Sequence, residues 1–354
     1  MDPQDMDVTF TFFGSGNETE LNTLRDWTLP SFFNQSHPLL FVVHGFTGSG
    51  SAMQQIYQEL KQRPVNVILV DWSKGASVKI CYPDPDIDWK LKLVGYPNAA
   101  SNTRVVGALI ASYARFVSKL VDRLSLHCIG FSLGAHVCGA AARYYRTVYF
   151  SVEFWDRVTG LDPAGPIFEW VESEKHRLYK TDADFVDVMH TDISTYGTPF
   201  PMGHVDFYPG QIGCVPGDYQ PACNLLGLQA PIRKPCARRN ITIVIAKNGE
   251  CPHSKQLSLG IFACNHMQAK RYYAESVAKT CKYRLEIEGK RQFMGYFVNK
   301  DGPLGMIKKG ATIQKGGPCF VTESSGSSRF SIPCETFGLL LVLSIFCSFR
   351  FCMF

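Results

Sequence analysis

The feature that most constrains the fold is a Gly-X-Ser-X-Gly motif, residues 130–134, between an apolar run and a helix-compatible segment. Residues 125–130 have the composition of a buried strand, and residues 133–145 have the apolar spacing of a helix. A chain that turns sharply from strand to helix has no room for side chains on either side of the turn, which explains the two glycines. The motif therefore predicts that Ser132 stands on a strained turn with its hydroxyl available for chemistry.

Short apolar runs alternate with long helix-compatible stretches through the first 281 residues. This alternation predicts an α/β fold with a mostly parallel central sheet and helices on both faces. Together with the serine turn, it indicates an α/β-hydrolase fold. The expected strands are 39–43, 65–71, 125–130, 157–161 and 185–190, and the expected helices are 99–123, 133–145 and 265–280.

A serine hydroxyl needs a histidine base, and in this fold the base follows the serine along the chain. Five of the nine histidines meet that condition once His136, which lies in the helix after the serine, is set aside; they are His176, His190, His204, His253 and His266. We select His266, because the preceding Cys264 and a helix start would fix its ring. His190 and His204 end strand-like runs, so we expect them to be structural.

The base in turn needs a carboxylate, which should lie at the carboxyl end of a strand. Asp162, at the end of the expected strand 157–161, fits best, with Asp187, Asp192 and Asp206 as competitors. The oxyanion that forms during attack needs two backbone N–H donors. We assign the N–H groups of Phe46, in the loop after strand 39–43, and Leu133, at the start of the helix.

The cysteine content favours an oxidising compartment. The chain has thirteen cysteines in 354 residues, eight of them between positions 214 and 334, and Asn-X-Ser/Thr sequons at Asn17, Asn34 and Asn240. The first ten residues lack the pattern of a secretion signal, so we expect the true N-terminus to lie upstream; an intracellular chain is the alternative. The net charge of +5 is spread thinly, which argues against a nucleic-acid partner but permits contact with anionic lipid.

The residues also resemble the pancreatic lipase family, which includes secreted phospholipases A1. The matching stretches are His44-Gly45-Phe46, Val70-Asp71-Trp72, 130–139, 158–166, 184–192, 203–209 and 263–276. The resemblance covers about residues 8–281 and implies hydrolysis of lipid esters by Ser132, Asp162 and His266. It also implies that Cys223 pairs with Cys264 and encloses a lid within residues 223–264, with an apolar run at 241–246.

Three departures from this family matter. Phe131 stands where a histidine is usual before the nucleophile, and we expect it not to touch the chemistry, because it should point away from the substrate. The stretch 174–182 resembles the family's calcium loop, but Tyr179 replaces a usually acidic residue, so we expect no metal and no other cofactor. Residues 282–323 predict a short β-rich extension rather than the family's C-terminal β-sandwich, so no colipase-type partner is expected.

The long lid favours acylglycerols as substrates, with phospholipids, cleaved at the first position, as the alternative. A carrier without catalytic activity is a hypothesis of another class, which the retained Ser132, Asp162 and His266 disfavour. Residues 324–354 read as a Ser/Gly linker and an apolar tail. They resemble a lipid-anchor signal with Ser325, Gly326 or Ser327 as acceptor, and a misread terminal segment is the equal alternative.

Overall fold

The computed structural model describes most of the first 301 residues and two short segments beyond them. The described residues are 3–14, 16–22, 27–77, 95–149, 155–169, 173–212, 215–217, 220, 223, 240–244, 263–278, 283–287, 290–301, 311–314 and 321–322.

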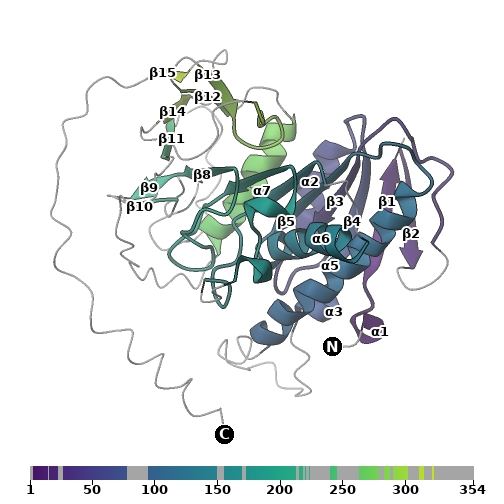
Figure 1. Cartoon of the computed structure of the whole chain (residues 1–354). Coiled ribbons are helices and arrows are strands. Elements are labelled where there is room, and N and C mark those ends of the chain that lie inside the picture. Colours follow the sequence, from purple (N-terminus) through teal and green to yellow (C-terminus); the bar gives the residue numbers. More distant parts are fainter. Residues whose placement is uncertain are drawn as a thin grey trace, which may run out of the picture.

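Within these residues one sheet of 11 strands forms the centre of the fold, in the order β15-β14-β11-β8-β7-β6-β5-β3-β4-β1-β2 (Figure 1). The strands from β4 to β8 in this order are parallel, and the remaining pairs are antiparallel. Their bounds are β1 Thr9–Gly14, β2 Asn17–Asn22, β3 Leu39–Val43, β4 Asn66–Asp71, β5 Leu126–Phe131, β6 Arg157–Leu161, β7 Phe185–Met189, β8 Val205–Pro209, β11 Asn240–Val244, β14 Ala311–Gln314 and β15 Val321–Thr322.

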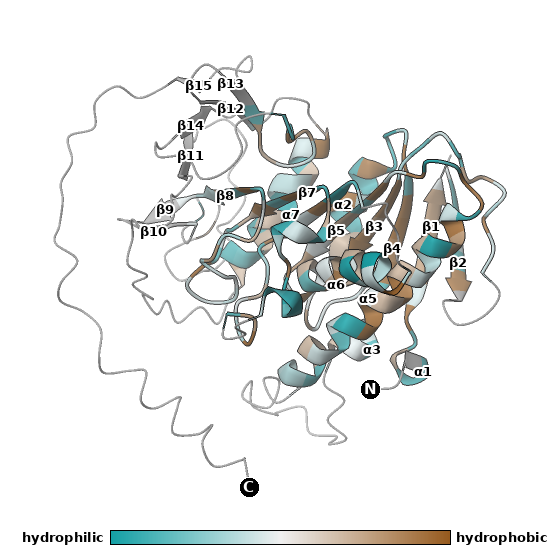
Figure 2. Ribbon diagram, viewed as in Figure 1, coloured by the Kyte–Doolittle hydropathy of each residue, from teal (hydrophilic) through white to brown (hydrophobic). Residues whose placement is uncertain are grey.

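Helices cover both faces of the parallel strands. Helices α5 (Tyr96–Ser118) and α6 (Leu133–Val148) pack on one face, and α2 (Gln54–Leu60) and α7 (Cys264–Ala278) pack on the other. Strand β3 shows how alternate side chains of one strand pack against the helices on the two faces of the sheet. Leu39, Phe41 and Val43 join the core under α5 and α6, whereas Leu40 and Val42 join the core under α2 and α7. Strand β3 is accordingly apolar along its whole length, and the strands beside it are mainly hydrophobic (Figure 2).

These features confirm the predicted α/β-hydrolase fold. The strands at 39–43 and 157–161 have the predicted bounds, and the helix predicted at 99–123 runs instead from Tyr96 to Ser118. Its start is three residues earlier because Pro97 occupies the first turn, where a missing N–H costs nothing. The remaining described elements are short: α1 Pro3–Met6, α3 Ser73–Ala76, β9 Gln211–Ile212, β10 Val215–Pro216, β12 Arg284–Ile287 and β13 Lys290–Phe293.

The segments around the predicted lid and extension add strands to the sheet. Asn240–Val244, expected within an irregular lid, is strand β11, which pairs with β8 and β14. Strands β12 and β13 form a hairpin, and β14 and β15 extend the main sheet. The rest of the predicted lid, 224–239 and 245–262, lies outside the described residues, as do Ser325, Gly326, Ser327 and the whole apolar tail.

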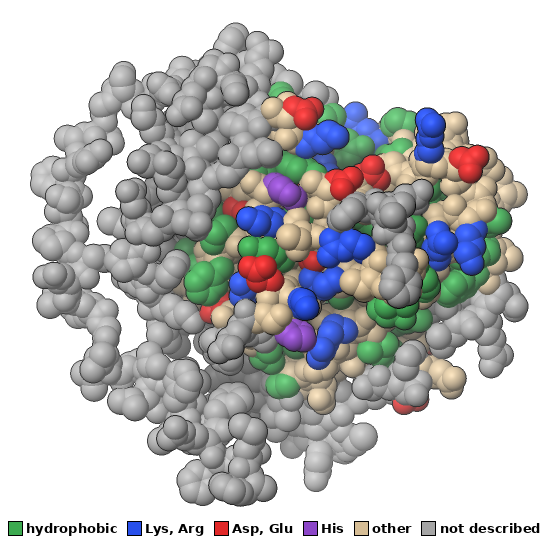
Figure 3. All heavy atoms as spheres, in the orientation of Figure 1, with side chains coloured by type: hydrophobic (Ala, Val, Ile, Leu, Met, Phe, Trp, Pro, Cys, Tyr) green, Lys and Arg blue, Asp and Glu red, His purple; other side chains and the backbone are tan. Residues whose placement is uncertain are grey.

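The described surface is mixed in character. On the face shown in Figure 3, Lys and Arg side chains are scattered among acidic and apolar ones. In the described part of the chain, no helix combines the length and the apolar character needed to cross a bilayer.

Candidate active site

The turn between β5 and α6 has the strained geometry that the motif predicts. Ser132 has φ 57° and ψ −120°, a backbone conformation that residues other than glycine rarely adopt. A Cβ atom on Gly130 would lie 2.1 Å from the Gly134 carbonyl oxygen, and one on Gly134 would lie 2.4 Å from the Val43 carbonyl oxygen. The steric reason for both glycines is therefore confirmed, and Ser132 is held at the carboxyl end of β5.

Strand β6 brings Asp162 to the same edge of the sheet. Phe131 and Leu161 are paired in register, and the Ser132 N–H donates to the Leu161 carbonyl at 3.0 Å, so Ser132 and Asp162 follow neighbouring strands at the same level. Asp162 is fully buried and has a positive φ of 47°. One of its oxygens, Oδ1, accepts hydrogen bonds from the backbone N–H groups of Thr191 at 2.7 Å and Asp192 at 3.2 Å.

The other oxygen of Asp162 binds the selected histidine. His266 Nδ1 donates to Asp162 Oδ2 at 2.5 Å, and His266 lies in the first turn of α7, two residues after Cys264. Cys264 forms a disulfide with Cys223, the pair that the resemblance implies, with a Cα–Cα distance of 5.9 Å. The residues selected from chain order and local context are thus brought together as a hydrogen-bonded acid and imidazole.

The possible metal ligands at this point are the same pair together with Asp192. Ligand atoms of Asp162, Asp192 and His266 lie within 4.8 Å of one another. Both oxygens of Asp162 already accept hydrogen bonds, one of them from His266. That pattern is typical of a carboxylate that orients a histidine rather than one that binds a metal ion.

Two of the three competing aspartates, Asp187 and Asp206, have other partners, whereas Asp192 lies beside the Asp162–His266 pair and donates its backbone N–H to Asp162. Asp187 accepts two hydrogen bonds from the Arg157 guanidinium, at 2.8 and 3.0 Å, and a third from the Thr159 hydroxyl at 2.8 Å. Asp206 Oδ1 lies 2.8 Å from His190 Nε2, and both residues are buried. His190 is therefore structural, as predicted.

His204 also serves the backbone. It accepts a hydrogen bond from the Val186 N–H through Nδ1, at 3.0 Å. Burial and the nearby Lys180 lower its pKa, which keeps the ring neutral so that Nδ1 stays an acceptor. His204 is therefore structural too.

The loop after β3 lies against the serine. A Cβ atom on Gly45 would stand 2.6 Å from Ser132 Cβ and 3.2 Å from Ser132 Oγ, so this backbone approaches the nucleophile as closely as a glycine permits. Phe46 follows directly, and its ring packs edge-on against Tyr96, with the ring centroids 5.1 Å apart. The loop is therefore placed where an oxyanion donor is needed, opposite the start of α6 at Leu133.

His44 fastens this loop to β4. The Trp72 backbone N–H donates to His44 Nε2 at 3.0 Å, so the ring proton resides on Nδ1, which donates to the Gly45 carbonyl at 2.9 Å. The Trp72 indole N–H donates to the His44 carbonyl at 2.9 Å. These three bonds fix the loop without using the N–H of Phe46.

Phe131 departs from its prediction. Its ring packs against His266, with the centroids 4.6 Å apart, and Lys270 Nζ lies 4.6 Å from the Phe131 ring centroid. Lys270 donates to the Ala52 carbonyl at 2.9 Å, and burial lowers its pKa to about 8. The residue before the serine therefore touches the imidazole, and sequence reasoning missed this because Phe131 and His266 are distant along the chain.

A second disulfide was also missed. Cys128 in β5 and Cys138 in α6 are bonded, and Ser132 lies between them. The spacing of ten residues across a strand-to-helix turn was the available signal, but thirteen cysteines allow many pairings. The bond ties the strand before the nucleophile to the helix after it.

The stretch that resembles a calcium loop does not fit the ion. Asp182 and the Arg177 carbonyl both accept hydrogen bonds from Arg143, at 2.5 and 3.2 Å, and the Asp182 carboxylate also accepts from the Tyr179 N–H at 2.9 Å. Calcium requires about six to eight oxygen ligands, and here a cationic side chain already occupies two of those offered.

The strained serine turn, the buried Asp162–His266 pair and the doubly covered parallel sheet define an α/β-hydrolase. The lipase family model matches residues 1–288, and the chain belongs to the lipase family.

Named relatives span two kinds of enzyme. The hepatic triacylglycerol lipase of Rattus norvegicus is 32% identical over 295 residues, which are 76% of this chain and 52% of that protein. The human hepatic triacylglycerol lipase is 30% identical over 321 residues, 84% of this chain and 57% of that protein. The probable phospholipase A1 magnifin of Vespa magnifica is 31% identical over 265 residues, 73% of this chain and 64% of that protein. The chain spans only about half the length of the first of these relatives.

Proposed function

We propose that the chain hydrolyses carboxylic esters of lipids, with Ser132 as nucleophile, His266 as base and Asp162 as the residue that orients the base. The observation that carries this proposal is the 2.5 Å hydrogen bond between His266 Nδ1 and Asp162. It places the ring proton on Nδ1 and leaves Nε2 as the acceptor for the serine proton.

The reaction follows from these roles. His266 Nε2 takes the Ser132 proton as the hydroxyl oxygen attacks the ester carbonyl, and the backbone N–H groups of Phe46 and Leu133 bind the oxyanion. The imidazolium then protonates the leaving alcohol, which departs and leaves an acyl-enzyme. Water, activated by the same imidazole, releases the fatty acid. Every proton in this scheme passes through His266, and no metal ion takes part.

For substrate class we propose acylglycerols first, in line with the names of the triacylglycerol lipases that the chain resembles. The disulfide between Cys223 and Cys264 supports this proposal, because it joins the two ends of residues 223–264, the segment expected to form a lid over a lipid site. The second candidate is a phospholipase A1. It is favoured by the match to magnifin, which covers a larger share of that relative than the match to the rat lipase does.

We propose contact with a lipid surface through the catalytic domain itself, without a helper protein, whether the enzyme is peripheral or anchored. Two apolar side chains near His266, the proposed base, are partly exposed to solvent. Met267 follows His266 and is 43% exposed, and Tyr196, whose ring lies 5.5 Å from that of His266, is 37% exposed. Apolar groups of this kind beside a site favour approach to an interface.

The experiment compares fatty-acid release from triacylglycerol emulsion and from phosphatidylcholine vesicles by one purified preparation, with Ser132→Ala as the inactive control. Faster release from triacylglycerol supports the acylglycerol proposal, and faster release from the first position of phosphatidylcholine supports the second candidate. Labelling by a fluorophosphonate reports the nucleophile independently of substrate. Failure of the native protein to be labelled, with no release from either lipid, favours a carrier and overturns the enzymatic proposal.

We also propose that the protein works outside the cytosol. Two disulfides within the described residues support an oxidising compartment. Peptide mapping without reduction tests this, because a free Cys264 thiol in native protein would contradict it.

A further inference from the structure

The loop that contains residues 174–182 is docked on α6, the helix that begins at the nucleophile. The Leu178 N–H donates to His136 Nδ1 at 3.1 Å, and the Leu178 backbone would lie 3.0 Å from a Cβ atom on Gly139. The loop precedes β7 and so joins the nucleophile helix to the strand beside Asp162. Contacts that stabilise this loop therefore also help to fix α6, which begins after Ser132, relative to β7, which lies beside Asp162.

The charge at the centre of this loop is the Asp182 carboxylate. Asp182 is 1% exposed, and burial raises its pKa to about 6 against the opposing effect of Arg143. An ionised carboxylate at this depth needs a cation or several hydrogen-bond donors. Arg143, on α6, meets this need with Nη1 2.5 Å from Asp182 Oδ1.

The same guanidinium also binds the loop backbone. Both terminal nitrogens of Arg143 lie 3.2 Å from the Arg177 carbonyl oxygen, so one planar group bridges a carboxylate and a carbonyl. The remaining acidic side chain of the stretch, Glu174, is exposed and hydrogen-bonds the Tyr179 hydroxyl. The oxygen atoms that could bind a calcium ion here are thus already hydrogen-bonded, either to the Arg143 guanidinium or to the Tyr179 hydroxyl.

We propose that Arg143 is the permanent cation of this loop, and that it replaces the calcium ion implied by the resemblance of residues 174–182. A divalent ion bound to Asp182 and to the Arg177 carbonyl would lie where the guanidinium lies, and two positive charges do not share one carboxylate at that distance. The loop is therefore stable without metal. This inference concerns folding and does not rest on the proposed hydrolysis.

The test is the melting temperature of the purified protein in EDTA and in millimolar calcium chloride, followed by circular dichroism. We expect the native protein to melt at the same temperature in both. Arg143→Ala should melt at least about 5 °C lower, because it leaves the Asp182 carboxylate buried without a hydrogen-bonded cation. Adding Asp182→Asn to Arg143→Ala should recover part of that loss, since the unpaired charge is then gone.

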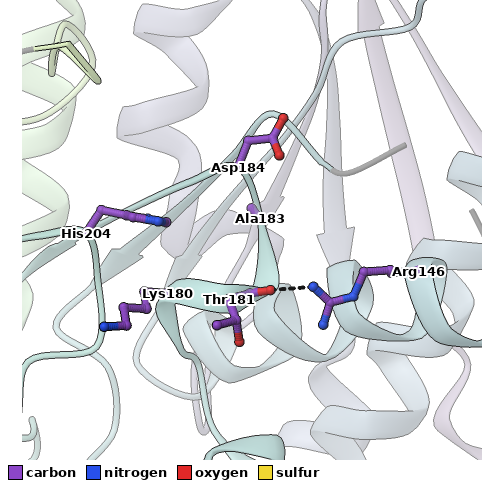
Figure 4. Close-up of a pocket in the computed structure, with 6 residues that line it drawn as sticks. All are labelled: Arg146, Lys180, Thr181, Ala183, Asp184 and His204. Atoms are coloured by element: carbon purple, nitrogen blue, oxygen red, sulfur yellow. Dashed lines mark hydrogen bonds between the residues drawn. The ribbon is translucent and has the colours of Figure 1, made fainter. Parts of the chain in front are cut away.

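Arg146→Ala is the matched control. Arg146 lies one turn further along α6, is partly exposed, and donates to the Thr181 carbonyl at 2.7 Å (Figure 4). It reaches the same loop but hydrogen-bonds a carbonyl rather than the buried carboxylate, on which it acts only as a nearby charge, so its loss should lower the melting temperature by less than about 2 °C. A general effect of removing positive charge from α6 would instead lower both variants equally and contradict the proposal.

Two further measurements keep the proposal open to refutation if Arg143→Ala does not fold. Calorimetric titration of the native protein with calcium chloride should give no saturable binding. Arg143→Lys should melt between the native protein and the alanine variant, since an ammonium replaces the charge but not the bridging geometry. Saturable calcium binding, a lower melting temperature in EDTA, or an Arg143→Lys variant as stable as the native protein in either condition would overturn it.

Discussion

Replacing Asp162 by asparagine tests the roles in the site more sharply than removing the nucleophile does. Oδ1 of Asp162 accepts from two backbone N–H groups, those of Thr191 and Asp192. The substituted side chain would have to keep its carbonyl oxygen at that position, because an amide N–H₂ cannot face two N–H donors. The amide nitrogen would then face His266 Nδ1 and donate to it.

The consequence is a change of tautomer. His266 Nδ1 must become an acceptor, so the ring proton moves to Nε2, the nitrogen proposed to take the serine proton. An imidazole in that tautomer cannot act as the base. We expect Asp162→Asn to lower kcat by about ten-thousand-fold, which corresponds to roughly 5 kcal/mol of transition-state stabilisation.

The assay uses a soluble short-chain ester, so that lipid binding does not enter, and divides each rate by the folded fraction from circular dichroism. Asp187→Asn is the control. Its carboxylate is as deeply buried as that of Asp162 but binds Arg157, so its loss should cost stability, by about 3 to 5 kcal/mol, without changing kcat per folded molecule. Normal turnover in Asp162→Asn, or loss of turnover per folded molecule in Asp187→Asn, would refute the assignment.

Three other perturbations have clear expected outcomes. Burial lowers the pKa of His136 to about 3. As the pH falls below about 6.5, His136 therefore binds a proton in the unfolded chain but stays neutral in the folded chain. In urea titrations, the native protein should therefore lose about 1.4 kcal/mol of unfolding free energy per pH unit between about pH 6 and 4 relative to His136→Gln, and parallel curves would contradict this. Gly45→Ala places a Cβ atom 2.6 Å from Ser132 Cβ, so kcat on a soluble ester should fall by at least about a hundredfold while the circular dichroism spectrum is retained; an unchanged kcat would show that the loop does not serve the oxyanion. The double variant Cys128→Ala and Cys138→Ala opens a loop with a sequence separation of ten and should lose about 3 kcal/mol of stability in urea, a loss that reduced native protein should exceed because reduction also opens the Cys223–Cys264 bond.

Elements whose signal is local could be predicted from the sequence. Strand β3 is apolar at every position because helices cover both of its faces, and the run is bounded clearly enough to give its exact ends. The serine turn is equally local, since the steric limits on Gly130 and Gly134 arise within a few residues of Ser132 and from the adjacent end of β3. Chain order then reduced the choice of base to five histidines.

Features that depend on which distant residues meet could not be predicted. Tyr179 signalled that the calcium loop is altered, but nothing near Arg143 in the sequence indicates that its guanidinium reaches Asp182, 39 residues later. In the same way, Phe131 looks like an ordinary core residue in the sequence, and only the fold shows that its ring contacts His266. Strand β11 was assigned to a lid because its pairing with β8 and β14 joins three segments that are far apart along the chain.

The two residues proposed for nucleophile and acid share an energetic problem that the surrounding structure solves. Ser132 and Asp162 both have positive φ, at the ends of adjacent strands, and each such residue costs about 1 to 3 kcal/mol. The bond between Cys128 and Cys138 closes the chain on either side of Ser132, whereas Asp162 is held by its hydrogen bonds to backbone N–H groups and to His266. Relaxing the turn at Ser132 would therefore pull against the disulfide, and relaxing the turn at Asp162 would break the hydrogen bonds of its carboxylate. Four other described non-glycine residues, Asp7, Thr47, Arg123 and Ile167, also have positive φ, but only Ser132 and Asp162 combine it with a proposed role in the reaction.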